Sequence, residues 1–558
     1  LFVFNVLRWD NHYERILVEN HTIIRKMQVE NNIITTDGAP LDDIYKGGVG
    51  YFCFELMKRH SPKIAELDAR TGQEETYESL LKKSIRTSII LQNKGVQKGD
   101  TIVIYSKNQL YACVPLISCF FLGAIPTYLD DLLTSIEVVN VLKQLDPKLI
   151  LTTSEKLETI QKFIKTEGSH VNTEILIFDQ GFYEPQENEG EFQPIYVNDL
   201  KETVMIPFSS GTTGFPKGIC ISHYALLRRN YDGLCPADKT KVLFSYGSFH
   251  WLIQAARLLC SIRSGICRLI DPEPFEAKKV WYLLEKFKVN VVFLIPYAVM
   301  EMYNVGKPKN LDLMNLTTII VPGCKLPKQY HQNVQELLPS VDVFLLYGQT
   351  EVGPLTALSK CDLHREYNRK KLGSIGVPYS GSGNSYKVVD LNTGEALGPN
   401  KPGELHVKSD AVMSGYYNVD SSDQFDEEGW LKTGDEVLYD EDLCFFIIDR
   451  IKDMIIHKGW HTPPAFLEEE LLNHPAVKRA VVIGIPHETD GEHPMALVVL
   501  KDNIKNATSK DIEKFIAERM PERFHLKAGV KFIDDSYFAG ARKVKRYLLK
   551  KLVLNGKI

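Results

Sequence analysis

Features that would assign the chain to several large classes of protein are missing from its 558 residues. None of its ten cysteines stands in a Cys-x-x-Cys pair, so the commonest sequence sign of a zinc or redox site is absent. Most cysteines lie in or beside apolar runs, and we expect buried, reduced thiols rather than a disulfide framework. The net charge is only −5 and no long basic run occurs, so we expect no nucleic-acid partner.

Signals for membrane insertion and secretion are also missing. The most apolar segment, residues 111–129, contains Pro115 and Pro126, so we predict a buried helix followed by a strand and no membrane span. Charged residues interrupt the first apolar stretch, so we expect a protein that is not secreted. The carboxyl-terminal Gly556-Lys557-Ile558 shares only its lysine with the Ser-Lys-Leu peroxisomal signal, which leaves a cytoplasmic and a peroxisomal location open.

The chain opens on Leu1, and its first methionine is Met27, which begins a polar segment. We expect residues 1–26 to be a non-native or disordered extension. N-terminal sequencing of natural protein that began upstream of residue 27 would contradict the first of these expectations.

The length is too great for one hydrophobic core, so we expect several subdomains. Short apolar runs separated by amphipathic stretches predict parallel sheets covered by helices on both faces. The apolar runs are residues 101–105, 149–151, 175–178, 289–295, 318–321 and 341–347, and the clearest amphipathic stretches are residues 135–145 and 278–287.

From about Gly403 the pattern changes to shorter alternating strands with tight turns. After Arg450 it predicts a helix, two strands and a second helix, at residues 464–473, 477–484, 495–501 and 509–519. The fold class is therefore α/β, with a large N-terminal domain over residues 27–448 and a small α+β domain over residues 449–558.

The strongest local signal is PFSSGTTGFPK, which ends at Lys217. Glycines let backbone N–H groups approach a phosphate, short hydroxyls add donors, and the lysine adds a compact positive charge. The order differs from a Walker A loop because Pro216 precedes the lysine and Gly218 follows it. The candidate phosphate-binding residues are Ser209, Ser210, Gly211, Thr212, Thr213, Gly214 and Lys217.

This loop resembles the signature of the AMP-binding, adenylate-forming superfamily, which includes acyl-CoA synthetases, aryl-CoA ligases, peptide synthetase adenylation domains and beetle luciferases. The resemblance implies a distorted β-barrel beside the parallel sheets and a mobile C-terminal domain. It also implies that the protein uses ATP and coenzyme A as co-substrates and Mg²⁺ as a cofactor. It extends over nearly the whole chain from about Met27, and its spacing is most similar to the insect acyl-CoA synthetases and beetle luciferases.

A second motif, Tyr347-Gly348-Gln349-Thr350-Glu351, follows an apolar strand, and ligands bind at the carboxyl ends of strands in open α/β sheets. The resemblance implies that Tyr347 packs on the adenine and that Thr350 contacts phosphate. It implies that Thr350 and Glu351 hold Mg²⁺, a role that suits a hard carboxylate. Gly348 and Gln349 belong to the same nucleotide-binding segment.

Two further motifs, GWLKTGD ending at Asp435 and FFIIDRIK around Arg450, resemble the ribose-binding and hinge motifs of the superfamily. The resemblance implies that Asp435 binds both ribose hydroxyls, as a carboxylate with two acceptor oxygens can. Arg450 is a second ribose contact, and Asp449 is the pivot of the mobile domain.

Three segments resemble parts of the superfamily that handle the acid and coenzyme A. His250 corresponds to a histidine that gates the acyl pocket between two half-reactions. Gly323 and Cys324 correspond to a strand that lines the adenine and acyl pockets, where Cys324 forms a wall rather than a nucleophile. Lys458 begins the face of the small domain that meets the active site during thioester formation. Nearby, Phe466 stands where the superfamily usually has Glu, and Glu468 or Glu469 could take the place of that Glu at the helix N-terminus.

The C-terminal catalytic lysine corresponds to Lys543, which resembles the lysine of a Pro-x-x-x-x-Gly-Lys pattern. Here Tyr537 replaces the proline and Arg542 replaces the glycine. There are two alternatives: Lys545 is the adenylation lysine, or this loop no longer takes part in adenylation.

The expected reaction activates a small-molecule carboxylic acid as its acyl-AMP and transfers the acyl group to coenzyme A. A medium or long fatty acid and an aryl-propenoic acid both fit, and fatty acid metabolism is the implied setting. A luciferase-type monooxygenase is an alternative, although Pro354 stands where beetle luciferases usually carry Ser. A second alternative is a non-catalytic relative that binds a nucleotide or an acyl group. No sequence feature indicates the oligomeric state.

Overall fold

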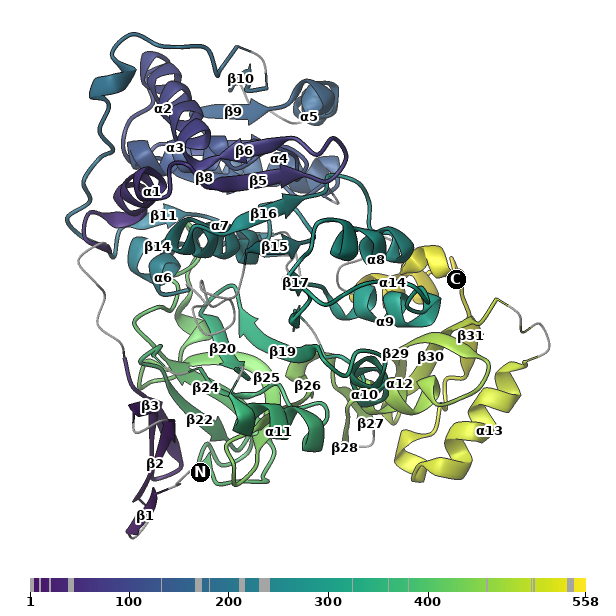
Figure 1. Ribbon diagram of the computed structural model, residues 1–558. Helices are drawn as coiled ribbons and strands as arrows, with labels where there is room; N and C mark the ends of the chain where they lie inside the picture. Colours follow the sequence, from purple (N-terminus) through teal and green to yellow (C-terminus); the bar gives the residue numbers. More distant parts are fainter. Residues whose placement is uncertain are drawn as a thin grey trace.

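The described residues of the computed structural model form two nine-stranded sheets, a four-stranded sheet and a separate five-stranded sheet, together with two short two-stranded ladders (Figure 1). It describes residues 5–9, 12–19, 22–38, 45–131, 133–165, 173–179, 181–209, 216–229, 241–323, 325–359, 361–379, 381–457, 460–502, 504, 507–538 and 546–558.

The first sheet is parallel and has four strands in the order β10-β9-β7-β8. Its strands are β7 (Thr101–Tyr105), β8 (Ile125–Tyr128), β9 (Leu149–Thr152) and β10 (Glu174–Ile177). Its neighbouring helices are α2 (Tyr77–Asn93), α3 (Val114–Leu122), α4 (Ser135–Leu145) and α5 (Leu157–Ile164). The predicted buried helix and strand within residues 111–129 are α3 and β8, so the sequence interpretation is confirmed.

The second sheet has nine strands, and its central strands from β19 to β5 are parallel, as predicted. In spatial order they are β21 (Val377–Pro378), β20 (Gly353–Ala357), β19 (Asp342–Gln349), β18 (Thr318–Pro322), β17 (Val291–Phe293), β15 (Val242–Ser245), β16 (Cys267–Ile270), β5 (Ile64–Asp68) and β6 (Glu74–Thr76). Its helices are α1 (Gly48–Arg59), α6 (His223–Arg228), α7 (Leu252–Ser264), α8 (Ala277–Lys286), α9 (Pro296–Val305), α10 (Lys328–Leu337) and α11 (Asp362–Lys370).

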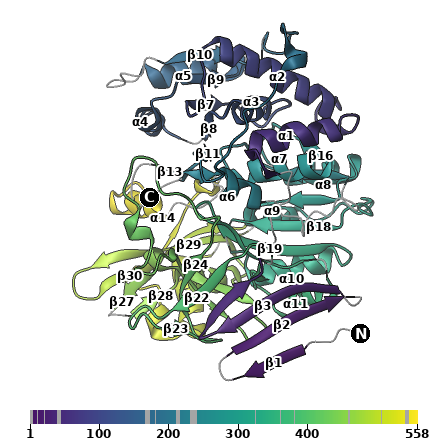
Figure 2. The same ribbon diagram turned by 90° about the vertical axis from the view of Figure 1, so that its left-hand side faces the viewer.

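The third sheet is antiparallel, and its main path runs β1-β2-β3-β4-β22-β24-β25-β26. Its strands are β1 (Asn5–Trp9), β2 (His12–Glu19), β3 (Thr22–Glu30), β4 (Ile33–Thr36), β22 (Ser385–Val389), β23 (Ala396–Leu397), β24 (Gly403–Lys408), β25 (Leu431–Tyr439) and β26 (Phe445–Arg450). We expected a small distorted barrel here, whereas the described strands follow an open path. Its edge is extended by β1–β3 (Figure 2).

Strands β1–β3 come from the N-terminal segment, and that residues 1–26 are a non-native or disordered extension stays a prediction. Residues 12–19 pair along β3, which pairs along β4, so backbone hydrogen bonding places them at the edge of an existing sheet.

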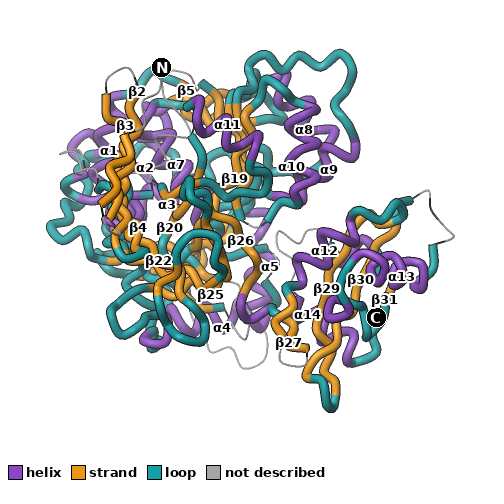
Figure 3. Tube along the Cα trace, turned by 90° about the horizontal axis from the view of Figure 1, so that it is seen from below, coloured by secondary structure: helices purple, strands orange, loops and turns teal. Residues whose placement is uncertain are grey.

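The C-terminal region forms a smaller α+β unit, which stands to one side of the larger sheets in Figure 3. It has its own apolar core, centred on side chains such as Leu467, Val482 and Ile512. Its elements are β27 (Ile455–His457), β28 (Trp460–Thr462), α12 (Pro464–Leu472), β29 (Val477–His487), β30 (Gly491–Leu500), α13 (Ser509–Arg519), β31 (Val530–Phe532) and α14 (Arg546–Leu554). A small α+β unit after a large α/β unit agrees with the predicted fold class.

The described cysteines are free thiols, as predicted, and most of them are buried. Burial raises the pKa of the Cys53 and Cys119 thiols, which keeps these groups protonated. Among the described residues, no helix is both long and apolar enough to cross a membrane.

Candidate active site

Asp435 lies at the centre of a buried polar cluster between two sheets. It is on β25 with only 3% of its surface exposed, and β26 places Arg450 directly opposite it in the strand register. Arg450 Nε lies 2.9 Å from Asp435 Oδ1. From β19 of the neighbouring sheet, Tyr347 donates its hydroxyl to Asp435 Oδ2 at 2.7 Å, and Gln349 Nε2 donates to the same oxygen at 2.6 Å. The structure therefore brings together four of the predicted nucleotide-binding residues.

The charges of this cluster follow from burial and from the central carboxylate. Burial, and then the Asp435 charge, raise the pKa of the Tyr347 hydroxyl well above its ordinary value, so this group remains a hydrogen-bond donor. Burial alone would lower the pKa of the Arg450 guanidinium, but Asp435, together with Tyr347, Glu351 and Asp453, outweighs burial and the pKa is raised. The site thus holds a fixed cation beside a carboxylate with two well-oriented oxygens.

Close backbone packing fixes the chain around Gly348. A side-chain carbon at Gly348 would lie 2.2 Å from the carbonyl oxygen of Gly353, which no real residue could tolerate. This contact lies at a β-bulge where β19 meets β20, directly before the Thr350-Glu351 turn. The glycine is therefore required by the turn that presents the candidate metal ligands.

The turn at Thr350 and Glu351 is held by two residues from other segments. Arg229, which is 2% exposed, donates from Nη1 to the Thr350 carbonyl at 2.9 Å. Met413 donates its backbone N–H to the Glu351 carbonyl at 2.6 Å. Sequence reasoning missed Arg229, because an arginine at the end of a short helix is ordinarily solvated.

Tyr416 links Glu351 to the segment that follows the phosphate loop. Its hydroxyl lies 3.4 Å from Glu351 Oε1, and Lys217 Nζ lies 5.0 Å from the centre of its ring. Burial, and then the Glu351 charge, raise the pKa of Tyr416 to about 12, so its hydroxyl donates to the carboxylate. The tyrosine thus places the candidate phosphate-binding lysine and the candidate metal ligand on the same side of the site.

The phosphate loop begins and ends on paired strands. In β12 (Phe208–Ser209) and β13 (Lys217–Gly218), Ser209 pairs with Lys217 in an antiparallel ladder. Of the predicted phosphate ligands, Ser210, Gly211, Thr212, Thr213 and Gly214 lie outside the described residues. The same holds for Cys324, Lys458 and Lys543.

His250 lies between β15 and α7, just before the first residue of that helix. Its Nδ1 is 2.5 Å from Ser248 Oγ, and its Nε2 is 3.6 Å from Asp130 Oδ2. The next residue, Trp251, borders Gly323, where an added side-chain carbon would lie 3.4 Å from the indole. The structure therefore brings the candidate gate histidine close to the candidate pocket wall.

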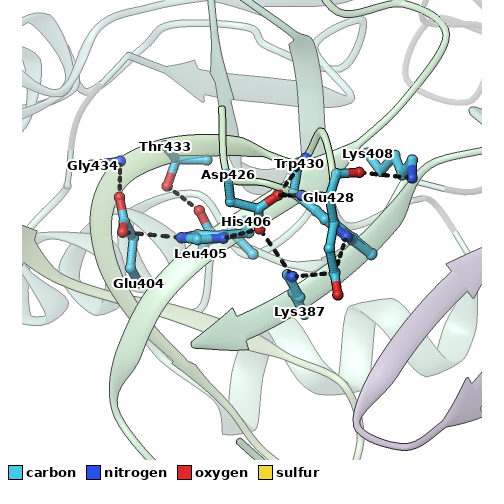
Figure 4. Close-up of polar contacts among 10 residues, drawn as sticks. All are labelled: Lys387, Glu404, Leu405, His406, Lys408, Asp426, Glu428, Trp430, Thr433 and Gly434. Carbon is cyan, nitrogen blue, oxygen red and sulfur yellow. Dashed lines mark hydrogen bonds and ion pairs between the residues drawn. The ribbon is translucent and has the colours of Figure 1, made fainter. Parts of the chain in front are cut away.

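A second polar network supports the segment that leads into Asp435 (Figure 4). Glu404 accepts a hydrogen bond from the backbone N–H of Gly434 at 3.0 Å, and Gly434 has a φ of +69°, which favours glycine. His406 connects Glu404 to Asp426, with ring nitrogens 3.0 and 3.2 Å from the two carboxylates. Burial alone would raise the pKa of Asp426, but the Trp430 N–H and the Lys387 ammonium lower it to about 2. The network could not be predicted from the sequence because its members come from β22, β24, β25 and the turn before β25, which only the fold brings together.

The predicted hinge joins the large unit to the first helix of the small unit. Asp449 accepts hydrogen bonds from the backbone N–H of Arg450 and from that of Ala465 in α12, both at 2.8 Å. Burial raises the pKa of Asp449, and the nearby Arg546 guanidinium opposes that shift. The carboxylate at the start of α12 thus comes from the hinge, whereas we expected Glu468 or Glu469 to supply it.

Arg479 and Lys325 each contact residues across the boundary between the small unit and the large one. Arg479 on β29 donates to Glu301 on α9 at 2.8 Å, and its guanidinium lies 4.3 Å from the centre of the Tyr297 ring. Lys325 donates to Glu469 on α12 at 3.3 Å and lies over the Phe466 ring. Because Lys325 follows the candidate pocket wall, the small unit contacts the chain just after that wall.

Comparisons with known proteins agree with this arrangement. The AMP-binding enzyme family matches residues 54–417, and the AMP-binding enzyme C-terminal domain matches residues 467–537. 4-Coumarate–CoA ligase 2 of Petroselinum crispum is 30% identical over 484 residues, which cover 84% of this chain and 87% of the ligase. Luciferin 4-monooxygenase of Nipponoluciola cruciata is 30% identical over 541 residues, covering 92% and 95%. The solved luciferase-like enzyme of the nonluminescent mealworm Zophobas morio has a TM-score of 0.70 and 30% identity, and the match covers 75% of this chain and 99% of that enzyme.

Proposed function

Since this chain belongs to the AMP-binding enzyme family, we propose that it is an ATP-dependent carboxylic acid–CoA ligase that forms an acyl-AMP intermediate. The observation that carries the proposal is the cluster of Tyr347, Asp435 and Arg450. It offers an aromatic ring and a carboxylate with two acceptor oxygens, which suit an adenine and a ribose diol.

The candidate Mg²⁺ ligands are Thr350 and Glu351, and these residue types fit the ion. Mg²⁺ prefers oxygen donors, and Tyr416 orients the Glu351 carboxylate by a contact of 3.4 Å. Bound there, the metal would offset the negative charge of the phosphates.

In the first half-reaction, a carboxylate oxygen of the acid attacks the α-phosphorus of ATP. The bond from that phosphorus to the bridging oxygen breaks, and pyrophosphate leaves. Lys217 contributes positive charge beside the phosphates, and we assign Lys543 to the carboxylate and α-phosphate. Charge that develops around phosphorus is stabilised most strongly by donors already in place.

In the second half-reaction, the small unit rotates about Asp449 and brings Lys458 toward the site. The coenzyme A sulfur then attacks the acyl carbonyl, and AMP leaves. The contacts of Arg479 with Glu301 and of Lys325 with Glu469 would break and re-form as the unit changes its orientation. His250 is the proposed gate between the two steps.

The relatives support an aryl-propenoic acid as the first substrate to test, because the plant relative is named as a coumarate ligase. They give no support to the fatty acid setting or to the peroxisomal location that we also expected. A luciferase-type monooxygenase is a second candidate, because a luciferin monooxygenase has the same 30% identity. Pro354, which is buried in β20, departs from the serine of beetle luciferases and favours the ligase.

The decisive experiment measures pyrophosphate release over a panel of aryl-propenoic and fatty acids with ATP and Mg²⁺, followed by detection of the acyl-CoA. We expect release with at least one acid and a thioester once coenzyme A is added. Light emission with luciferin would favour the monooxygenase instead. ATP binding without pyrophosphate release for any acid would favour a non-catalytic relative and refute the proposal.

Two lysine variants test the assignment of Lys543. We expect Lys543→Ala to slow acyl-AMP formation by roughly 10²–10³-fold, the usual loss when a transition-state charge contact is removed. The same variant should convert supplied acyl-AMP to thioester at nearly the normal rate. Lys545→Ala is the matched control and should release pyrophosphate normally. The reverse ranking of the two variants would move the role to Lys545, and equal loss of both half-reactions in Lys543→Ala would contradict it.

A further inference from the structure

Three histidines and an aspartate gather within the small unit, and none of them contacts Asp435 in the described hydrogen bonds and ion pairs. His457 is the last residue of β27, His487 ends β29, His493 lies on β30, and Asp490 lies in the turn between β29 and β30. One donor atom from each of His457, Asp490 and His493 lies within 4.8 Å of the others. These residues converge because β27 pairs with β30 at His457 and Gly491. None of them has a part in the proposed ligase reaction.

The hydrogen bonds of His457 prepare it to bind a metal ion. The residue is 2% exposed, and its Nδ1 lies 3.0 Å from the Glu492 carbonyl, which can only accept. This contact selects the tautomer with the proton on Nδ1, in which the Nε2 lone pair is the one that can bind a metal ion. A backbone carbonyl on the second ring nitrogen is the usual support of a metal-binding histidine.

The other members of the cluster are held in place by one another. His493 Nε2 lies 2.9 Å from Asp490 Oδ2, and the ring of His493 stacks on that of His487 with 3.9 Å between the centres. The backbone N–H of Asp490 donates to His487 Nδ1 at 3.3 Å. The turn between β29 and β30 thus carries its carboxylate toward the imidazoles.

We propose that His457, Asp490 and His493 form a zinc site on the small unit. Two imidazoles and one carboxylate, with a fourth position open to water, are a common donor set for Zn²⁺ and an unsuitable one for Mg²⁺, which prefers oxygen donors. A tetrahedral zinc ion needs donors roughly 3.4 Å apart, so the side chains would draw together by at most about 1.5 Å. The partly exposed His493 and the turn at Asp490 supply that adjustment.

The position of this site gives it a structural consequence. His457 immediately precedes Lys458 in the chain. Zinc would tie the end of β27 to the turn between β29 and β30, and so restrain the chain where it enters the Lys458 segment. The ion-binding test that follows does not depend on the ligase activity, so its failure is distinguishable from a failure of the proposed function.

The test is isothermal titration calorimetry of tag-free, chelator-treated full-length protein with Zn²⁺ and, separately, with Mg²⁺. We expect one zinc ion per chain in the wild type and no comparable binding of Mg²⁺ in the absence of nucleotide. His493→Gln and Asp490→Asn should each weaken zinc binding by at least ~100-fold, because they remove direct ligands. His525→Gln, which changes another histidine of the small unit, should leave zinc affinity unchanged.

Cobalt spectroscopy gives a second readout that does not rely on affinity. Co²⁺ in the wild type should give the visible absorption of a four- or five-coordinate nitrogen and oxygen site, without a sulfur charge-transfer band. His493→Gln should abolish that spectrum while its metal-free thermal unfolding stays close to that of the wild type. Zinc binding of equal strength in the wild type and both ligand variants would overturn the proposal, as would the absence of zinc binding at micromolar concentration.

Discussion

The buried imidazole of His223 makes the stability of the large unit depend on pH. His223 is the first residue of α6 and is 3% exposed. Its Nδ1 accepts a hydrogen bond of 3.1 Å from the backbone N–H of Val49, near the start of α1. A proton on Nδ1 would face that N–H at a helix N-terminus, where positive charge is unfavourable. The Glu202 carboxylate and the Lys98 ammonium shift the ring's pKa in opposite directions, and they pair with each other at 2.6 Å.

Burial, assisted by Lys98 and opposed by Glu202, lowers the pKa of His223 from 6.5 to about 4. Between these two values the unfolded chain binds more protons than the folded protein, so stability rises with pH. The contribution is complete above the unfolded pKa and is lost as the pH falls toward about 4. From the two pKa values, the loss between pH 7.5 and pH 5 is about 2 kcal/mol, and the full loss below pH 4 is about 3 kcal/mol.

The assay compares urea unfolding of the wild type and His223→Asn at pH 7.5 and pH 5. Asparagine keeps an acceptor oxygen near the position of Nδ1 and does not titrate in this range. We expect the free energy of unfolding to fall by about 2 kcal/mol more in the wild type than in the variant, with unchanged denaturant dependence. An equal fall in both proteins, or an NMR titration that assigns His223 an ordinary pKa, would refute the reasoning.

Two further predictions concern the charge pairs of the site and of the contact between the units. Asp435→Asn leaves the Arg450 guanidinium without its carboxylate. Because the Arg450 side chain is 28% exposed, we expect the free energy of unfolding to fall by about 2–3 kcal/mol, somewhat less than for a fully buried pair. ATP affinity by calorimetry should fall with it, and an unchanged affinity would remove Asp435 from the ribose site. Arg479→Leu breaks the contact with Glu301 and should speed tryptic cleavage at the hinge about fivefold, which corresponds to the loss of ~1 kcal/mol of contact free energy between the units. The control is Arg519→Leu, which breaks an ion pair within the small unit. Equal cleavage rates in the two variants would show that Arg479 does not hold the units together.

The regular elements of the chain could be predicted from local pattern. Residues 101–105 form β7, residues 135–145 form α4, and residues 509–519 form α13, with the predicted bounds. The helices among these begin at capping boxes, in which a threonine side chain and an acidic residue satisfy each other's backbone N–H groups. Such signals lie within a few residues of one another and need no knowledge of the fold.

The arrangement of the third sheet could not be predicted in the same way. Strand pairing depends on contacts between segments far apart in the chain, such as Tyr386 on β22 opposite Ile34 on β4. The same limit applies to supporting residues of the site. Arg229 acts through the Thr350 carbonyl, 121 residues along the chain, and His406 joins Glu404 to Asp426, which lies 20 residues away. Resemblance identified the residues expected to touch the nucleotide, whereas the residues that position them appear only in the structure.

The described residues on either side of the Lys543 segment are held by the small unit. Phe538, before the segment, packs in the core of the small unit, where the Arg479 guanidinium lies 5.5 Å from the centre of its ring. Arg546, after the segment, donates to both carboxylate oxygens of Glu468 on α12, at 2.9 and 2.7 Å. Both ends are therefore fixed to the small unit, and rotation of that unit about Asp449 would carry Lys543 with it.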